Sequence, residues 1–297
     1  MAASLTPVGE GTYVLGGGSN IGFMVQGGEA LVVDAGLDAD AARRALRALA
    51  SLGAEPRALL LTHAHADHSG GAAALASRAG IPVLASPPEA AVARQPLLEP
   101  VYLYGGASPP PALRGKFLLA APCPAVQEIE PGPLSVGEFH IDVLPLPGHA
   151  PGQVGFAWGQ TLFCADAFFP EETLAKHGVP YVFDLDAALE TLAALDQSRF
   201  AAYAAGHGAC LAAVAAVTAA NRERLLEVRA WVAEALRQPQ DADAVAAGVA
   251  NRCGLELTTP AQFLLTRATV LAALTSLQRA GQATHELRGN RLLWRRA

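Results

Sequence analysis

The sequence predicts an α/β (α+β) fold followed by a small, mostly helical module. Short apolar runs separated by glycine-rich turns recur along the chain up to about residue 205, a pattern typical of strands. Segments with apolar residues at helical spacing lie between these runs. After residue 208 the spacing becomes helical and ends in a hairpin signal. We therefore expect a β-rich domain with a separate C-terminal module.

The composition indicates a folded protein with a large core. Of the 297 residues, 52% are hydrophobic and 16% are charged. The net charge of -6 and the pI of about 5.7 argue against a general nucleic-acid-binding protein, because such proteins depend on excess lysine and arginine. The four cysteines are far apart in sequence, which favours reduced thiols. We expect a cytoplasmic protein without membrane contact, since residues 1–7 lack the regions of a signal peptide and no apolar run has the length of a membrane span.

The first part of the chain should contain most of one sheet. A fully apolar run at residues 58–62 fits a buried strand and leads directly into His63. Asp38 or Asp40 is placed to cap the preceding helix. The elements expected here are strands at 12–15, 21–26 and 30–34, a helix to about 52, a strand at 58–62, a helix at 71–78 and a strand at 83–85.

Residues 95–126 interrupt this pattern. Seven prolines fall in the segment, and proline breaks regular elements, so we expect an irregular, lid-like insertion. The aromatic and basic residues in and beyond it are candidates for substrate contacts, although surface exposure is the simpler interpretation for most of them. These candidates are Tyr102, Tyr104, Arg114, Lys116, Lys176, His177 and Tyr181.

The remaining elements divide the chain into three parts. We predict a β-rich domain at 1–208, a connecting helix at 209–238 and a winged-helix-like module at 239–297. A helix start at Thr259-Pro260 and a turn at Gly289-Asn290 support the module. The expected elements are strands at 139–144, 154–158, 161–164 and 201–205, helices at 186–197, 211–237, 241–252 and 270–280, and a hairpin at 283–287 and 291–294.

Three histidines and an aspartate follow the apolar strand within six residues. They are His63, His65, Asp67 and His68, in the spacing HxHxDH. Alternate residues of an extended turn share a face, and the last two can face a second point from the next helix. Imidazole and carboxylate are ligands for zinc, iron or manganese, so this segment alone predicts two neighbouring metals. A polar turn with incidental histidines is the weaker interpretation, because five of the chain's eight histidines fall in the full set of candidates.

Further candidate ligands stand at later strand ends. They are His149 in a PGHAPG segment, Asp166 after a CA pair and His207 between two glycines. Singly, each is compatible with an ordinary turn or cap. Cys164 stands two residues before Asp166, where it is either a redox-sensitive neighbour of the metals or, as we favour, a buried strand residue.

In order and spacing these segments resemble the metallo-β-lactamase superfamily over roughly residues 10–208. The resemblance implies an αββα sandwich with metals between the sheet edges, and a role for Asp34 in orienting ligands. It also implies two divalent metal ions, for which we expect zinc, with iron or manganese as alternatives. Position by position, the first metal would be bound by His63, His65 and His149, the second by Asp67, His68 and His207, and Asp166 would bridge them.

The resemblance implies a dinuclear metal-dependent hydrolase. Two metals about 3.5–4 Å apart can share a hydroxide that attacks a carbonyl or phosphoryl centre. Asp67 is the residue we expect to position this hydroxide and to shuttle its proton. The bridging Asp166 argues against antibiotic hydrolysis and makes the set similar to glyoxalase II, lactonases and the RNase Z group. The glutathione-binding residues of glyoxalase II have no match in the tail.

The substrate interpretation stays open between two chemistries. Phe168, Phe169 and Tyr181 suggest a partly apolar mouth, which favours a small-molecule ester, thioester or lactone. The alternative is an endoribonuclease or phosphodiesterase acting on RNA, because the tail is similar to a winged helix of a related endoribonuclease group. A regulatory nucleic-acid-binding protein with a vestigial core is disfavoured by the complete ligand set. For the tail we favour a packing module or the interface of a homodimer over nucleic-acid contact, with solvated arginines at Arg267, Arg279, Arg288, Arg291, Arg295 and Arg296.

Overall fold

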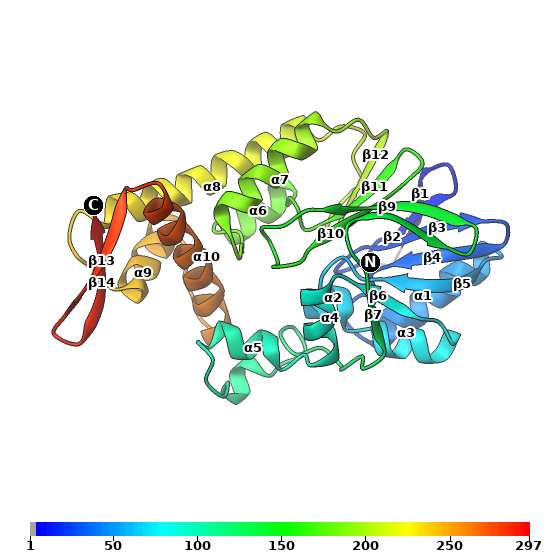
Figure 1. The fold of residues 1–297 in the computed structure, drawn as a ribbon, viewed down its shortest axis with the longest axis horizontal. Coiled ribbons are helices and arrows are strands. Elements are labelled where there is room, and N and C mark those ends of the chain that lie inside the picture. Colours follow the sequence, from blue (N-terminus) through cyan, green and yellow to red (C-terminus); the bar gives the residue numbers. More distant parts are fainter. Residues whose placement is uncertain (1–3) are drawn as a thin grey trace. The chain divides into compact units, whose positions relative to one another are not determined.

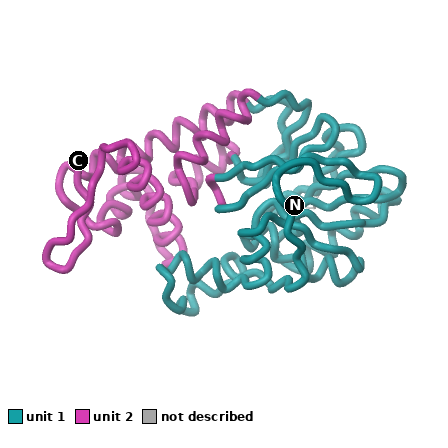
Figure 2. Tube along the Cα trace, viewed as in Figure 1, with its two compact units in different colours: residues 1–147, 151–167, 198–214 teal, residues 148–150, 168–197, 215–297 magenta. Residues whose placement is uncertain are grey.

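The computed structural model describes residues 4–297 and divides them into two compact units. Figure 2 shows unit 1, in teal, and unit 2, in magenta. Among the described residues, unit 1 comprises 4–147, 151–167 and 198–214, and unit 2 comprises 148–150, 168–197 and 215–297. Unit 2 therefore joins segments from within the first 208 residues to the C-terminal part of the chain. The predicted domain boundary at residue 208 stays a prediction.

Unit 1 contains a seven-stranded sheet in simple sequence order. Its first four strands are antiparallel, and β4, β5, β6 and β7 run parallel to one another. The carboxyl ends of those parallel strands therefore meet at one edge of the sheet. The strands are β1 (Leu5–Gly9), β2 (Thr12–Leu15), β3 (Ile21–Gln26), β4 (Glu29–Val33), β5 (Glu55–Leu60), β6 (Val83–Ala85) and β7 (Val126–Glu128).

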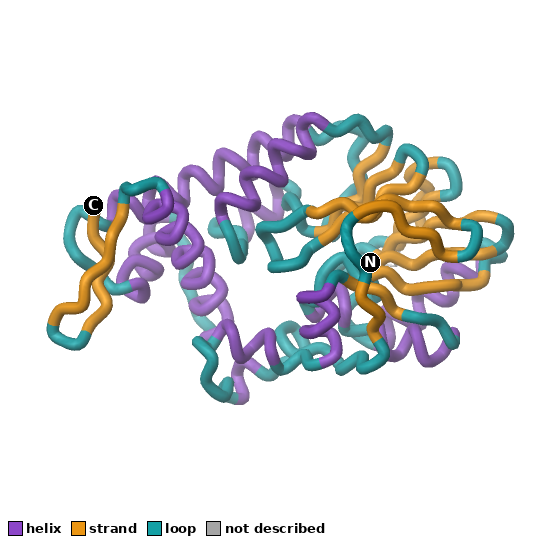
Figure 3. The backbone as a smooth tube through the Cα atoms, viewed as in Figure 1, coloured by secondary structure: helices purple, strands orange, loops and turns teal. Residues whose placement is uncertain are grey.

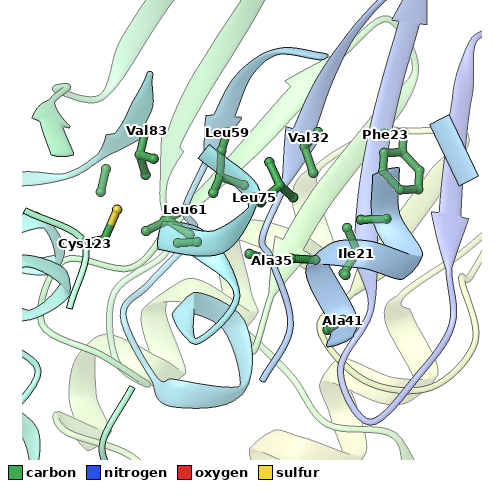
Figure 4. Packing of buried hydrophobic residues seen from close by; sticks show 14 of the residues in the cluster. Ile21, Phe23, Val32, Ala35, Ala41, Leu59, Leu61, Leu75, Val83 and Cys123 are labelled. Atoms are coloured by element: carbon green, nitrogen blue, oxygen red, sulfur yellow. The ribbon is translucent and has the colours of Figure 1, made fainter. Parts of the chain in front are cut away.

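One face of this sheet packs against helices. These are α1 (Ala39–Ser51), α3 (Ala72–Ala79) and α4 (Pro87–Arg94). In α1 the buried positions are mostly alanines, with Leu49 at its end, so the helix backbone lies close to the strands. Phe23 and Val32 of the sheet pack in the same cluster as Ala41 of α1 and Leu75 of α3 (Figure 4).

The other face packs against a second sheet of five strands. On β4, Val32 belongs to the helix-side cluster while Leu31 and Val33 belong to the cluster between the sheets, as the alternation of a strand requires. Phe139 and Phe156 enter that cluster from the second sheet. The order of that sheet is β12 (Ala202–Ala205), β11 (Thr161–Ala165), β10 (Val154–Trp158), β9 (Phe139–Pro145) and β8 (Gly132–Val136), and Figure 1 shows it facing the first sheet.

The proline-rich insertion is more regular than its sequence predicts. It contains α5 (Leu98–Leu103) and a 3-10 turn at Pro111–Leu113. Pro100 is tolerated because it occupies the third position of α5, where a backbone N–H has no partner inside the helix. The strands β1 and β8 and the helices α4 and α6 were also not predicted, because each is short and contains or adjoins proline.

Unit 2 is mostly helical and ends in a hairpin (Figure 3). Its helix α10 begins with a capping box in which Thr259 and Gln262 satisfy each other's backbone N–H, as the helix start at this point predicts. The mixed α/β class with a helical C-terminal part is thus confirmed, while the winged-helix name for the module stays a prediction. The elements are α6 (Glu171–His177), α7 (Leu185–Gln197), α8 (Ala215–Ala235), α9 (Ala242–Arg252), α10 (Pro260–Arg279), β13 (Ala283–Arg288) and β14 (Arg291–Arg296). Within residues 4–297, none of the helices combines the length and the apolar character needed to cross a membrane.

Candidate metal centre

The candidate site begins where two parallel strands of the first sheet end. Asp34 follows β4, and the loop with Thr62 and His63 follows β5. The Asp34 N–H donates to the carbonyl of Leu60 at 2.9 Å, so the two strand ends stay in register. Side chains that leave both ends therefore share one edge of the sheet.

Asp34, at the end of β4, makes hydrogen bonds to the segment that follows β5. Its carboxylate accepts from the Thr62 N–H at 2.9 Å, from Thr62 Oγ1 at 2.8 Å and from His68 Nδ1 at 2.8 Å. It is 3% exposed and has a φ of 62°, a strained conformation for a residue that is not glycine. The bond to His68 Nδ1 turns Nε2 of that ring away from Asp34 and fixes the ring orientation. The orienting role that the resemblance implies for Asp34 stays a prediction.

The HxHxDH segment forms a tight loop and one helical turn, α2 (Ala66–Ser69). The rings of His63 and His65 lie with their centroids 4.6 Å apart, and those of His63 and His68 lie 4.2 Å apart. The Ser69 hydroxyl donates to the Ala64 carbonyl at 2.8 Å, which closes the loop from inside. His63 and His68 are fully buried. The short spacing in sequence therefore becomes a cluster of imidazoles in space.

The second sheet contributes Asp166 and His207 from neighbouring parallel strands. Asp166 follows β11 and His207 stands two residues after β12. Gly206 directly precedes His207, and a Cβ at this position would meet Asp166 Oδ1 at 2.0 Å and His68 Cε1 at 2.7 Å. Only glycine fits this position without moving a site residue. His207 Nε2 lies 3.3 Å from Asp67 Oδ2 and 3.4 Å from Asp166 Oδ2.

The turn between β2 and β3 holds the His207 loop and the Asp67 loop. Asn20 Nδ2 donates to the carbonyls of Ala205 and Gly208 at 2.9 and 2.8 Å. His207 Nδ1 contacts the Gly18 carbonyl at 2.8 Å, which leaves Nε2 for the site. The Ser19 hydroxyl donates to the Asp67 carbonyl. A turn recognised from sequence only by its glycines thus positions two candidate ligands.

Among the candidate ligands, His149 is the one that belongs to unit 2. It is 7% exposed, and its Nδ1 contacts the Tyr181 carbonyl at 3.1 Å. The rings of Phe169 and Tyr181 each stand edge-on to its ring, with centroids 5.5 Å away. The chain on both sides of it, up to Pro147 and from Pro151, belongs to unit 1.

Oppositely charged side chains lie close together in the site and shift one another's pKa values. Burial alone would raise the pKa of Asp67, but the charge on His68 and a hydrogen bond from His207 lower it to about 2. Burial alone would lower the pKa of His207, but hydrogen bonds to Asp166 and Asp67 raise it to about 10. The charges of Asp166 and Asp67 also raise the pKa of His68 well above its usual value despite burial. A divalent cation would take the place of these protons.

The donor set fits divalent metal ions. Within unit 1, two groups of three donors, His63 with His68 and Asp166, and Asp67 with His68 and His207, have ligand atoms within 4.8 Å of one another. Ligand nitrogens of His63 and His65 also lie within that distance. His68 Nε2 is fully buried and makes no hydrogen bond of good geometry in the described part of the chain, which a metal ion would remedy.

Cys164 is no part of this donor set. It is fully buried, as the core interpretation predicts, and its thiol donates to the Ala204 carbonyl at 3.4 Å. Burial raises the pKa of the thiol far above its ordinary value, which keeps it protonated.

Two buried polar groups near the site were missed by sequence reasoning. Asn20 is 8% exposed and Glu89 is 3% exposed, and both bond to loops that carry candidate ligands. The available signal for Glu89 is the pattern Ser86-Pro87-Pro88-Glu89, which matches a capping box. That pattern indicates a helix start but does not indicate which distant loops the side chains reach.

Comparison with known proteins agrees with this geometry. The family model described as "Metallo-beta-lactamase superfamily" matches residues 14–207. A hydroxyacylglutathione hydrolase of Anaeromyxobacter dehalogenans (strain 2CP-C) is 32% identical over 219 residues, which is 70% of this chain and 71% of the relative. A probable metallo-hydrolase of Bacillus subtilis (strain 168) is 28% identical over 206 residues, which is 63% of this chain and 79% of the relative.

Solved structures share the fold. A metallo-beta-lactamase family protein of Thermus thermophilus superposes with a TM-score of 0.75 at 22% identity, covering 97% of this chain and 99% of that chain. A beta-lactamase domain protein of Burkholderia ambifaria gives a TM-score of 0.75 at 19% identity, covering 100% of this chain and 94% of that chain. At these sequence identities, the likeness to the two structures concerns the fold alone.

Replacing Gly206 by alanine should impair metal binding. The new Cβ would overlap Asp166 Oδ1 and press on His68, so both donors must move. We expect metal affinity, measured by competition with a chromophoric chelator, to fall roughly 10–100-fold, the range for disturbed ligand orientation. The control is Gly115→Ala, where a Cβ meets nothing within 4 Å. Equal affinities for Gly206→Ala and the wild-type protein would contradict the placement of Asp166 and His68 in the metal centre.

Proposed function

Because the chain belongs to the metallo-beta-lactamase superfamily and is a metal-dependent hydrolase, we propose that it cleaves an acyl bond, in an ester, thioester or lactone. The observation that carries the proposal is the set of histidine and carboxylate donors at the converging strand ends, with aromatic rings beside His149. The activity is assigned to this site.

The proposed centre holds two divalent metal ions, with zinc as the native metal. When bound, the metals polarise the scissile carbonyl and make water acidic enough to act near neutral pH. The chain's part is to supply oriented donors. His63, His65 and His149 are assigned to the first metal, Asp67, His68 and His207 to the second, and Asp166 to both.

Backbone connectivity supports the assignment of His149. Its loop leaves and re-enters unit 1 at Pro147 and Pro151, so the Cα of His149 is within about 8 Å of both prolines at ~3.8 Å per residue. The base of the loop is closed by the Leu146 N–H, which donates to the Gln153 carbonyl at 3.0 Å. The Val154 N–H donates to the Thr62 carbonyl at 2.9 Å, one residue before His63.

Asp67 is proposed as the catalytic carboxylate. Its side chain is 36% exposed, whereas the side chains of Asp34 and Asp166 are nearly buried, so it is the site aspartate that water and substrate reach most readily. Its lowered pKa keeps it ionised, so that it can hold the attacking water through a hydrogen bond. In this role Asp67 orients the attacking water and returns the proton to the leaving group.

The distribution of charge favours an acyl substrate over a phosphodiester. Nucleic-acid sites depend on cations that are free to contact phosphates. Each arginine singled out in the tail instead pairs with an acid of unit 2. The pairs are Arg267–Asp243, Arg279–Asp184 and Arg279–Asp186, Arg288–Glu286, Arg291–Asp241, Arg295–Glu286 and Arg296–Glu234.

The basic residues of the insertion are engaged as well. Arg114 donates to the Pro109 carbonyl and Ser108 Oγ, and Lys116 pairs with Asp38 at 3.2 Å. The insertion also buries the carboxyl group of Glu99, whose pKa is raised well above its usual value by burial and by the charges of Asp67 and Glu89, so it adds no positive charge. These surroundings suit an uncharged acyl group better than a polyanion.

Relatives support the same chemistry. Two of them, from Anaeromyxobacter dehalogenans and Albidiferax ferrireducens, carry the name hydroxyacylglutathione hydrolase, which describes hydrolysis of an acyl compound. Phe169 and Tyr181 beside His149 supply apolar surface for an acyl chain. We further propose a cytoplasmic enzyme whose partner is a small acyl substrate. RNA cleavage is the second candidate function, and a homodimer through the C-terminal module is the proposed assembly.

A substrate panel tests the proposed reaction. The purified protein is assayed on a thioester, a lactone, a generic phosphodiester and a structured RNA, beside a chelator-treated sample and His63→Ala. We expect cleavage of the thioester or the lactone that disappears in both controls, because His63 is a buried donor of the centre. Metal-dependent cleavage of the RNA or the phosphodiester alone would contradict the acyl proposal and favour the second candidate.

Replacing Asp67 by asparagine separates its catalytic role from its shape. Asparagine keeps the size of the side chain but cannot accept a proton, so we expect kcat to fall roughly 100–10,000-fold on the acyl substrate. Metal content is measured in the same sample. Turnover within a few-fold of the wild-type value, with metals retained, would remove Asp67 from the proton-transfer role.

A further inference from the structure

The first turn of α4 contacts two of the loops that carry candidate ligands. Glu89 Oε2 accepts from the Ala64 N–H at 2.8 Å, and Ala64 lies between His63 and His65. Glu89 Oε1 accepts from the Gly152 N–H at 2.8 Å, in the loop that carries His149. One carboxylate therefore bridges the two loops that hold the three histidines assigned to the first metal.

The same turn of α4 also binds the carbonyl group of Gly152. The hydroxyl of Ser86 donates to the Gly152 carbonyl at 2.6 Å. Gly152 itself is packed so tightly that a Cβ would meet Ser86 Oγ at 2.6 Å and Pro88 Cδ at 2.9 Å. Gly152 is thus held through its N–H, through its carbonyl and by contact with Pro88.

These side chains do not make the bonds that their sequence pattern predicts. Ser86 and Glu89 occupy the N-cap and N3 positions of a capping box, yet Ser86 makes no capping bond to the helix. Prolines at the first two helical positions remove N–H groups that would otherwise require a cap. Fewer donors at this helix start therefore need a cap, and Ser86 and Glu89 bond to the ligand loops instead.

A buried carboxylate needs a reason to be retained. Glu89 is 3% exposed, and removal of an acidic side chain from water costs free energy unless hydrogen bonds offset the cost. Two backbone donors on separate loops supply those bonds, and each donor would be left without an acceptor if Glu89 were absent. The carboxylate thus fixes the separation of the two loops.

We propose that Glu89 is a positioning residue for the first metal, the one assigned to His63, His65 and His149. It acts through the backbone at Ala64 and Gly152 and touches neither metal nor substrate. The inference rests on the proposed two-metal site. It predicts that loss of the Glu89 bridge weakens one metal position selectively, because Asn20, Ser19 and Asp34 hold the ligands of the other position.

Glu89→Gln is the test, since glutamine has nearly the same shape but only one acceptor oxygen. Chelator-treated wild-type and variant proteins are titrated with Co²⁺, and the d–d absorption and the two dissociation constants are recorded. We expect two Co²⁺ ions per wild-type chain. In Glu89→Gln we expect roughly 10–100-fold weaker binding of one ion, the range for outer-shell partners, and an unchanged second constant.

Glu128→Gln is the matched control. Glu128 also pairs with a residue of α4, Arg94, at 2.7 Å, but it is exposed on β7. We expect wild-type constants for it. A second variant, Ser86→Ala, removes the bond to the Gly152 carbonyl alone and should weaken the same ion by a smaller factor. It tests the inference if Glu89→Gln fails to fold.

The outcomes distinguish the inference from the function on which it rests. A purely structural Glu89 would lower the melting temperature of the metal-free variant and leave both Co²⁺ constants unchanged, which overturns the inference alone. Equal weakening of both ions also overturns it, because the effect would not be confined to the first site. A wild-type protein that binds no Co²⁺ would overturn the proposed function, and the inference with it.

Discussion

The carboxylate of Asp34 is the interaction on which the site depends. It stands where β4 ends, adopts a positive φ, and bonds to the backbone and side chain of Thr62 and to the ring of His68. These bonds join the ends of β4 and β5 and fix which nitrogen of His68 faces the other donors. The strained backbone of Asp34 is maintained by the hydrogen bonds that its side chain makes.

The remaining donors reach the same place because two sheets end there. Asp166 and His207 follow parallel strands of the second sheet, and Gly206 leaves room for Asp166 beside His68. Hydrogen bonds from outside the donor set hold the loops, with the Gly18–Asn20 turn on the His207 side and the first turn of α4 on the His63 side. A donor cluster of like and opposite charges needs this support, because its members would otherwise be free to move apart in the absence of a metal.

The sequence was sufficient for parts of the site that are local, and insufficient for parts that depend on distant contacts. The spacing of His63, His65 and His68 after an apolar strand predicted a cluster, and the structure brings those rings together. The roles of Asn20 and Glu89 were not predictable, because their partners lie 185 residues and 25 or more residues away in the chain. Proline content does not predict the short helix α5, because Pro100 stands in the first helical turn, where proline is tolerated.

Direct measurement of bound metal tests the central claim, that the converging strand ends form a two-metal hydrolytic centre. Elemental analysis of the purified protein would be combined with the same analysis of His63→Ala and His207→Ala, which remove one donor from each proposed metal position. The account predicts about two divalent ions per wild-type chain and about one in each variant, following the two-metal arrangement. A wild-type protein without divalent metal, or variants that retain the full wild-type content, would contradict it.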